Sequence, residues 1–371
     1  MQRPTLPPIS PLPYQDEAGA FELQQRLVKA TTEELPGALA YTADAGVRPP
    51  LGRPDTTARV ERVLAKAFGA QAACLVQGAG TGAIRVALSA GPWRLNDRRL
   101  IVHDAPDYTT TATTSHDGMV EPLRVDYNDS EALANVLAAP DSPKWLYLQH
   151  SRQKLTDSYD PIKVVELAKQ AGKRVIVDEN YTVVRTPVIG VERGASASAF
   201  SLFKLHGPPG VGVVLGDADI IEAAHRSNYS GGGQVQGDQA LTALQQLVCD
   251  PLNWARQSQE TIKLAKLLNA GAVPGIVAAA NANTQDLNCI ALLENQIGEQ
   301  VQAKAAEFGA APYPVGANSK YEIGPMIYRL SSSNLEEQPE LKGWTLRINP
   351  MRASADLVVD ILSKAINAVV A

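Results

Sequence analysis

The chain has 371 residues, of which 45% are apolar, and carries a formal net charge of −5. This length is typical of two domains or of one large domain with an appendage, and the apolar content is sufficient for a large core. The weak negative charge provides no basic field for nucleic acid or for an anionic membrane, so we expect neither as a partner.

Cysteine usage and the first residues indicate the compartment. The three cysteines, Cys74, Cys249 and Cys289, are scattered and fit no metal-binding or disulfide spacing. Unpaired cysteines are typical of a reducing compartment. The first eight residues lack the continuous apolar stretch of a signal peptide, and no window is long and apolar enough for a membrane span. The sequence therefore predicts a cytoplasmic protein without a metal site or a membrane segment.

The N-terminal region is predicted to be an arm followed by a helix. Residues 1–20 are rich in proline, which favours an extended segment. Apolar residues then recur at helical spacing over 21–34, and Leu35-Pro36-Gly37 ends that helix. We assign residues 1–45 to this arm and helix.

Residues 46–250 are predicted to form a large domain around a doubly wound sheet. A loop at 46–56 leads into an amphipathic helix, after which strands alternate with helices, as in mainly parallel α/β sheets. Strands are expected at 72–76, 99–103, 120–125, 144–149, 173–178, 196–203 and 213–216. Helices are expected at 60–68, 84–90, 130–138, 161–172 and 219–227.

The pattern changes in the last third of the chain. Two helices, over 238–248 and 254–269, are followed by separated strands at 288–293, 326–330 and 344–348. Further helices are expected at 299–308 and 353–370. Strands and helices that no longer alternate regularly favour a smaller α+β domain, which we assign to residues 251–371.

A glycine-rich turn joins the strand at 72–76 to the next helix. It contains Gly78, Gly80, Thr81 and Gly82. A strand, a glycine loop and a helix start present free backbone N–H groups and the helix dipole to an anion. The turn lacks the Walker lysine and the dinucleotide spacing. Such a turn binds phosphate or allows a helix to pack closely on a strand, and the turn alone leaves both interpretations open.

Two charged residues follow neighbouring strands of the predicted sheet. Asp178 ends one apolar run, and Lys204 follows another. Ligands of open α/β sheets bind beyond the carboxyl ends of the strands. There, a carboxylate can keep a pyridine nitrogen protonated, and a lysine can carry pyridoxal phosphate (PLP) as a Schiff base. Taken singly, each residue also fits an ordinary charged strand end. Together they favour a PLP site.

In order and spacing, these residues resemble the fold-type I PLP-dependent enzymes, the aspartate aminotransferase superfamily. The similarity is greatest to its cystathionine-synthase-like and class V aminotransferase-like branches. It extends from about residue 48 to the C-terminus and rests on Gly80-Thr81, Tyr108, Asp178 and Lys204. The resemblance implies a PLP-dependent transferase fold, with a large cofactor-binding domain and a smaller C-terminal domain.

The resemblance also implies how the cofactor is bound. Gly80, Thr81 and Gly82 would bind its phosphate, and Ser201, three residues before the lysine, would add a second hydroxyl. Tyr108 would stack on the ring, although a partly buried core tyrosine also fits this threonine-rich segment.

Asp178 and Lys204 are the residues to which the resemblance assigns the chemistry, with Tyr108 beside them. Asp178 would pair with the pyridine nitrogen. Lys204 would form the Schiff base and then move protons at the substrate Cα.

Five residues are candidates for contacts with the remaining groups. Gln153 or Gln149 is expected at the phenolic oxygen of the cofactor, where the family often has an asparagine. Arg347 resembles the small-domain arginine that clamps the substrate carboxylate, since a guanidinium binds a carboxylate with two parallel hydrogen bonds. Arg352 and Arg152 are alternatives for this clamp.

Two loops resemble segments that reach a neighbouring protomer in related enzymes. They are Tyr229 with the glycines at 231–233, and the segment 53–56. Both imply a homodimer with shared active sites.

The sequence therefore predicts a PLP-dependent enzyme that acts on a small-molecule substrate, an amino acid or amine, through Lys204. An aminotransferase is favoured because Arg347 fits carboxylate capture and no thiol nucleophile stands out. Cys74 lies in the strand before the glycine turn, which argues against a cysteine desulfurase. The alternatives are a PLP-dependent lyase that eliminates a group from Cα or Cβ, and a non-catalytic scaffold or sensor of the same fold.

Overall fold

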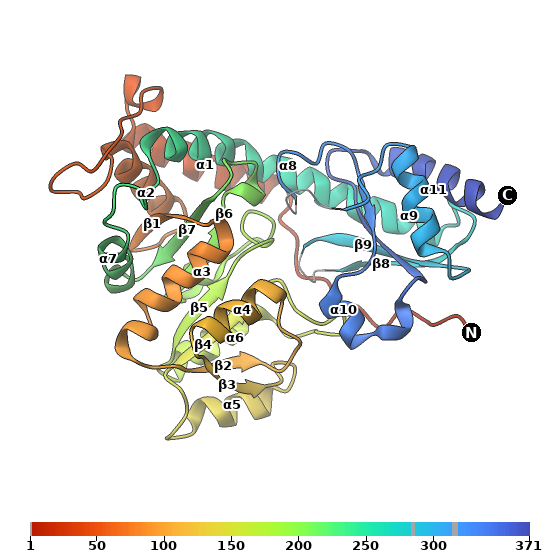
Figure 1. Cartoon of the computed structure of the whole chain (residues 1–371), viewed down its shortest axis with the longest axis horizontal. Coiled ribbons are helices and arrows are strands. Elements are labelled where there is room, and N and C mark those ends of the chain that lie inside the picture. The colour runs from red at the N-terminus through yellow and green to blue at the C-terminus, as the bar shows by residue number, and fades with distance from the viewer. Residues whose placement is uncertain (1, 283–285, 314–317) are drawn as a thin grey trace.

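The computed structural model describes residues 2–282, 286–313 and 318–371. Within these ranges the larger of two sheets has seven strands in the order β1-β7-β6-β5-β4-β2-β3 (Figure 1). The strands are β1 (Ala72–Gln77), β2 (Arg99–His103), β3 (Glu121–Val125), β4 (Trp145–Gln149), β5 (Arg174–Asp178), β6 (Ala197–Ser201) and β7 (Val211–Gly216). Only β7 runs against its neighbours, which confirms the mainly parallel sheet.

Helices cover both faces of this sheet because side chains alternate along each strand. In β4, Trp145 and Tyr147 pack with α3 (Ala79–Ala90) and α7 (Ala218–Ser227). Leu146 and Leu148 point the other way and pack with the remaining helices of this half. These helices are α5 (Ser130–Ala138) and α6 (Pro161–Gln170). Toward β1 and β7, α1 (Glu17–Glu34) and α2 (Asp55–Ala67) form a third cluster.

In the described residues the smaller sheet has four antiparallel strands in the order β10-β11-β9-β8. They are β8 (Ile276–Ala282), β9 (Asn288–Leu293), β10 (Met326–Tyr328) and β11 (Thr345–Asn349). One face packs on α9 (Gly298–Glu307), α11 (Ala355–Val370) and the C-terminal half of α8 (Gly237–Asn269). The short α10 (Ser332–Glu337) lies beside this sheet (Figure 1). A C-terminal α+β unit is therefore present, as predicted.

One long helix, α8, joins the two sheets (Figure 1). The sequence pattern predicted two helices here, over 238–248 and 254–269. Pro251 lies between them, and a proline removes a helical hydrogen bond and usually ends a helix. The structure has a single helix with Pro251 inside it. Asp250, Pro251 and Trp254 are all buried, so packing on both sides of the proline offsets the lost bond. The predicted boundary between residues 250 and 251 lies within α8, and the division into domains stays a prediction.

Three elements were not predicted: β8, α10 and α4 (Thr109–Asp117). The α4 sequence contains mainly threonines and a single apolar residue, so it has neither high helix propensity nor an apolar face. Single-turn 3-10 helices were not predicted either; they are η1 (Gly37–Ala40), η2 (Trp93–Leu95), η3 (Gly190–Arg193), η4 (Phe203–Leu205) and η5 (Pro339–Leu341).

The N-terminal arm runs from α1 to the smaller sheet, where its end lies beside α10 (Figure 1). Residues 2–16 have no helix or strand. Leu6 and Ile9 pack on a cluster that includes Leu155 and Leu330, and the Gln15 N–H donates to the Arg185 carbonyl at 2.7 Å. The arm therefore contacts both halves of the chain. None of the helices in the described ranges combines the length and hydrophobicity needed to cross a membrane.

Candidate active site

A cavity of about 200 Å³ lies where β5 and β6 end and α3 begins. We call it the Lys204 pocket. Seven of the predicted site residues line it: Gly80, Thr81, Tyr108, Gln149, Asp178, Ser201 and Lys204. The strand ends are brought together because β5 and β6 pair in parallel register, with Asp178 opposite Ala199. Gly82, Gln153 and Arg347 do not line the pocket.

The glycine turn contains two glycines with different roles. A Cβ atom at Gly80 would lie 2.3 Å from Oδ1 of Asn180, so only glycine lets α3 begin this close to the end of β5. A Cβ atom at Gly82 would lie 2.1 Å from the Gln77 carbonyl, so Gly82 serves the packing of α3 on β1. Gly80 and Thr81 are in the first turn of α3, where backbone N–H groups have no helical partner. This end of the pocket suits an anion.

Asp178 is the last residue of β5 and is buried. Its Oδ1 accepts hydrogen bonds from the backbone N–H and the Nδ2 of Asn180, at 2.9 and 2.7 Å. The Tyr147 hydroxyl donates to Oδ2 at 3.4 Å. Burial raises the pKa of Asp178, although the Asn180 donors and the charge of Lys204 oppose this shift. The carboxylate is therefore held in place and gains from a cationic partner.

Lys204 lies in η4, directly after β6. Its Nζ is 3.7 Å from the centroid of the Tyr181 ring. Burial lowers the pKa of Lys204 to about 8, although the charge of Asp178 opposes this shift. At neutral pH a much larger fraction of this amine is unprotonated than in an ordinary lysine, and the unprotonated amine is the nucleophile.

Sequence reasoning missed Asn180 and Tyr181, which also line the pocket. Tyr181 has a φ of +72°, in the left-handed region that residues other than glycine seldom adopt. This conformation turns the chain just after β5 and places the ring against Lys204. Their only sequence signal is their position two and three residues after Asp178.

Ser201 ends β6 and has a buried hydroxyl. Among the described residues, this hydroxyl has no hydrogen-bond partner. Because Ser201 lines the pocket, this hydroxyl can form its hydrogen bond to a group bound there. PLP requires four features that this pocket combines: an unpaired hydroxyl, the first turn of a helix, a buried carboxylate and a lysine of low pKa. The residues present fit this cofactor.

Tyr108 lines the same pocket and is the residue before α4. Its side chain is 37% exposed, so it is a pocket-wall residue and not a core tyrosine. The nearby Tyr181 and partial burial raise the pKa of Tyr108. The hydroxyl therefore stays protonated at neutral pH.

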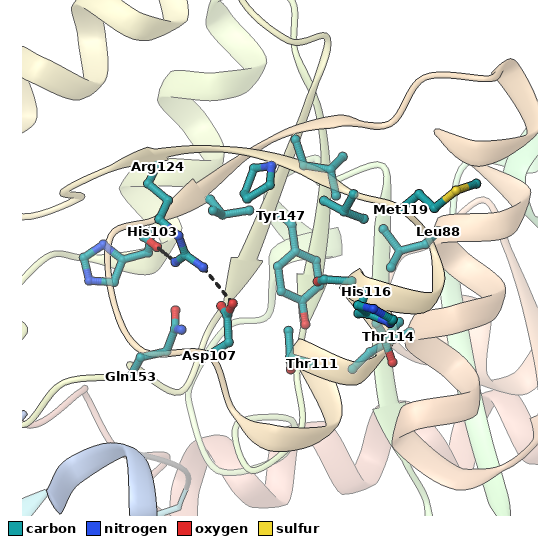
Figure 2. A pocket seen from close by; sticks show the side chains of 16 residues that line it. Leu88, His103, Asp107, Thr111, Thr114, His116, Met119, Arg124, Tyr147 and Gln153 are labelled. Atoms are coloured by element: carbon teal, nitrogen blue, oxygen red, sulfur yellow. Dashed lines mark hydrogen bonds and ion pairs between the residues drawn. The ribbon is translucent and has the colours of Figure 1, made fainter. Parts of the chain in front are cut away.

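The structure separates the two glutamine candidates. Gln149 lines the Lys204 pocket, and its Nε2 donates to the Ser151 carbonyl at 2.8 Å. Gln153 instead lines a neighbouring cavity of about 370 Å³, together with Asp107 and Arg124 (Figure 2). Its Nε2 donates to the Pro106 carbonyl at 3.1 Å. Gln153 thus supports the segment before Tyr108 from outside the pocket.

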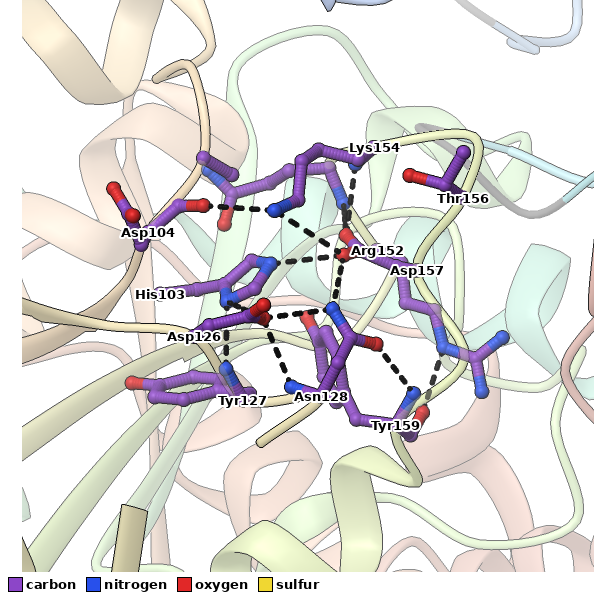
Figure 3. A network of polar contacts seen from close by, with 12 residues as sticks. His103, Asp104, Asp126, Tyr127, Asn128, Arg152, Lys154, Thr156, Asp157 and Tyr159 are labelled. Atoms are coloured by element: carbon purple, nitrogen blue, oxygen red, sulfur yellow. Dashed lines mark hydrogen bonds and ion pairs between the residues drawn. The ribbon is translucent and has the colours of Figure 1, made fainter. Parts of the chain in front are cut away.

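A polar network fixes the segment that carries Gln153 (Figure 3). His103 Nε2 and Asp157 Oδ1 are 2.9 Å apart, and the Tyr127 N–H donates to His103 Nδ1 at 3.1 Å. Asp157 Oδ2 also accepts the N–H groups of Gln153 and Lys154. Both ring nitrogens of His103 are engaged by protein groups, so this network joins β2 to the segment after β4.

The alternative carboxylate clamps are also engaged elsewhere. Arg152 donates from Nε to the Tyr159 carbonyl at 2.7 Å (Figure 3). Its Nη1 donates to the Ser10 carbonyl. Arg352 donates to the Glu322 carbonyl at 2.6 Å. Both arginines therefore hold backbone segments.

Arg347 lies in β11 and is buried. Its Nη2 bonds to Asp286, and its Cζ is 5.2 Å from the Tyr328 ring centroid. Asp286 also accepts hydrogen bonds from the side chains of three asparagines, Asn288, Asn318 and Asn349. We call these five charged and amide residues the Asp286 network. Burial raises the pKa of Asp286, but Arg347 and Asn318 outweigh burial and lower it. Arg347 is thus already paired with an acid, and it lies outside the lining of the Lys204 pocket.

The predicted partner-facing loops lie together in this chain. Arg53 pairs with Glu61 of its own chain at 2.5 Å. A Cβ atom at Gly52 would lie 3.3 Å from the Tyr229 ring, and Tyr229 is 66% exposed. Cys74 and Cys289 are buried, and none of the three cysteines lines the Lys204 pocket.

Comparison with known proteins identifies the family. Residues 57–258 match the model of the class-V aminotransferases, and residues 262–362 match that of the YhfS-like C-terminal domain. The Escherichia coli (strain K12) protein YhfS is 44% identical over 350 residues, which cover 93% of this chain and 96% of YhfS.

Solved structures agree with this assignment. The crystal structure of the PLP-dependent protein YhfS from Escherichia coli superimposes with a TM-score of 0.93 and 43% identity, over 97% of this chain and 99% of that chain. Apo CalE6, a methionine γ-lyase from Micromonospora echinospora, shares the fold, with a TM-score of 0.71 and 18% identity over 92% of this chain and 98% of that chain. The chain therefore belongs to the class-V aminotransferase family and is a PLP-dependent enzyme of fold type I that resembles YhfS.

Proposed function

We propose that the protein is an aminotransferase that acts on an amino acid and binds PLP covalently through Lys204. The observation that carries this proposal is the Lys204 pocket itself. A lysine of low pKa, a buried carboxylate and an unpaired buried hydroxyl line one cavity at the start of α3. When bound, PLP withdraws electrons from the substrate carbon that bears the amino group.

The pocket residues would divide the work of binding. The first turn of α3, with Gly80 and Thr81, and the Ser201 hydroxyl would bind the phosphate. Asp178 would keep the pyridine nitrogen protonated, since burial makes a cationic partner favourable for it. Tyr108 would cover the ring, and Gln149 would contact the phenolic oxygen.

Lys204 would have two successive tasks. Its unprotonated amine would attach the cofactor, and after displacement by the substrate the same amine would move a proton at the substrate Cα. A pKa of about 8 suits both tasks, because it lies close to the pH at which a cytoplasmic enzyme works.

Arg347 is the residue that we propose for the substrate carboxylate. Its charge acts on the pKa of Tyr108 and of Tyr181, both of which line the Lys204 pocket. The pair with Asp286 would fix the guanidinium beside the pocket, so that carboxylate binding selects α-amino acids over simple amines.

We also propose that the protein acts as a homodimer with shared active sites. The loop around Gly52 packs against the loop that carries Tyr229. Tyr229 is 66% exposed and Tyr41 is 83% exposed, and exposed aromatic rings are enriched at protein interfaces. Sedimentation equilibrium tests the dimer: a monomer at micromolar concentration would contradict it.

A panel of amino acids tests the reaction. The purified protein should be yellow, and a substrate should convert the cofactor to pyridoxamine phosphate and release one equivalent of keto acid. Release of keto acid and ammonia with recovery of the yellow colour would indicate a lyase instead. No spectral change with any amino acid would contradict an enzyme that acts on amino acids and would favour a scaffold or sensor.

A further inference from the structure

Arg185 is a buried arginine that has no acidic hydrogen-bond partner in the described part of the chain. It lies in the segment between β5 and β6, seven residues after Asp178, and its side chain is 3% exposed. Its Nη2 donates to the Lys204 carbonyl at 3.4 Å. Within the described ranges, neither Nε nor Nη1 has a hydrogen-bond partner. A buried charge without an ion pair is unfavourable for folding, so its presence requires another explanation.

Helix α8 holds this guanidinium in place. The Cζ atom of Arg185 is 3.6 Å from the centroid of the Trp254 ring. Trp254 also stacks on His206, with ring centroids 5.3 Å apart and an interplanar angle of 6°. His206 Nδ1 and Asp250 Oδ1 are 2.5 Å apart. Asp250 and Trp254, one turn apart in α8, therefore hold two residues near Lys204. One is Arg185, which bonds to the Lys204 carbonyl, and the other is His206, two residues after Lys204.

The same guanidinium acts electrostatically on the Lys204 amine. Both cations lie against the Tyr181 ring, with Lys204 Nζ at 3.7 Å and Arg185 Cζ at 5.7 Å from its centroid. Burial is the main cause that lowers the pKa of Lys204, and the charge of Arg185 adds to it. Three groups act on Lys204 in the opposite direction: Asp178, Tyr108 and Asp286. The groups that act on Arg185 are Asp286, Tyr181 and Asp250.

We propose that Arg185 is a positioning residue for Lys204. It anchors the Lys204 backbone through the carbonyl oxygen, and it keeps a fixed positive charge beside the amine so that the nitrogen releases its proton readily. Trp254 holds the guanidinium without neutralising it, which a carboxylate would do. The lack of an acidic hydrogen-bond partner is then the functional feature. This inference rests on the proposal that Lys204 binds the cofactor.

The test uses the holoenzyme and the pH midpoint of its visible absorbance. Replacing Arg185 by methionine removes a positive charge near the Lys204 nitrogen, so that nitrogen should keep its proton to higher pH. For two like charges in a partly buried site, the midpoint should rise by roughly one pH unit. Arg185→Lys keeps the charge, and its midpoint should lie close to that of the unmodified protein.

Arg174→Met is a matched control. Arg174 also lies over a tryptophan, with Cζ 4.7 Å from the Trp145 ring centroid. It stands at the opposite end of β5 from Asp178 and pairs with Asp217 and Asp219. Its loss should leave the midpoint unchanged. A midpoint in Arg185→Met that moves no further than in this control overturns the proposal.

Two further variants separate the possible failures. If Arg185→Met does not give folded holoenzyme, Arg185→Gln takes its place. The glutamine keeps a donor for the Lys204 carbonyl but removes the charge, so the pH midpoint of the visible absorbance must rise as expected for Arg185→Met. An unchanged midpoint in a folded Arg185→Gln holoenzyme would also overturn the proposal. Lys204→Ala tests the proposal that Lys204 binds the cofactor, on which the role of Arg185 depends. If that variant keeps the visible band, the assignment of Lys204 fails, and the role of Arg185 fails with it.

Discussion

The Lys204 amine and the Asp286 carboxylate are both buried, but they differ in the groups that surround them. In the Asp286 network the carboxylate accepts hydrogen bonds from Arg347 and from three asparagine side chains. In the Lys204 pocket the amine faces a tyrosine ring, and the Ser201 hydroxyl has no partner among the described residues.

This difference distinguishes groups that stabilise the fold from groups that are available to bind a ligand. A buried group whose hydrogen bonds are all made stabilises the fold and is costly to disturb. A buried group that is left open raises the energy of the protein until a ligand binds it. We therefore propose the Lys204 pocket as the reacting centre, and we propose that the Asp286 carboxylate holds Arg347 in a fixed position near it.

The largest expected effect comes from Lys204→Ala. Loss of the amine removes both covalent cofactor binding and proton transfer at Cα, so amino-acid conversion should fall by at least about a thousandfold. The yellow colour should also be lost, which absorbance spectra measure. Lys154→Ala is the control: Lys154 bonds to the Asp104 carbonyl outside the pocket, so this variant should stay yellow. A yellow Lys204→Ala protein would contradict the assignment.

Asp286→Ala should mainly lower the free energy of unfolding. It leaves Arg347 buried without its acid, and breaking a buried ion pair in this way typically costs about 3–5 kcal/mol. Urea unfolding of the cofactor-free protein measures this loss. Asp178→Asn should lower the unfolding free energy much less, because burial already disfavours the charge of Asp178. If Asp178→Asn were the more destabilising change, the comparison between the two regions would be wrong.

The sequence predicted the large sheet well for a physical reason. Strands of a parallel sheet are buried on both faces, so they appear as short continuous apolar runs, and their carboxyl ends meet at one edge. Asp178 and Lys204 could be predicted as site residues because Asp178 ends one such run and Lys204 follows another. The order of the strands and the antiparallel β7 required the structure.

The other site residues depend on contacts that no local pattern records. Asp286 meets Arg347 across 61 positions of sequence, and Arg185 is held by Trp254 of α8. Tyr181 reaches Lys204 only because its backbone adopts a positive φ. Gln153 and Gln149 both follow or end β4, and only the structure assigns one of them to the pocket.

Two serines of β6, Ser198 and Ser201, test the same distinction with smaller expected effects. Ser198 is fully bonded: its hydroxyl donates to Glu179 at 3.3 Å and accepts the Val191 N–H at 3.0 Å. Ser201→Ala should weaken cofactor binding by roughly tenfold or more, because it removes one hydrogen bond to a charged group. The stability of the cofactor-free protein should not fall. Ser198→Ala should cost about 1–3 kcal/mol of stability and leave cofactor affinity unchanged. Titration with PLP and urea unfolding measure both quantities, and the reverse pattern would refute the distinction.

The smallest expected effect concerns pH. The pKa of Lys204 is about 8 in the folded protein and lies below its ordinary value, so the folded state releases this proton as the pH rises through 8. Only the unprotonated amine attacks the aldehyde, and cofactor capture by the cofactor-free protein should therefore accelerate by roughly tenfold from pH 7 to pH 9 and then level off. Stopped-flow absorbance measures this rate. A rate that still rises steeply above pH 10 would mean that Lys204 titrates like an exposed lysine and that enclosure by the pocket does not activate it.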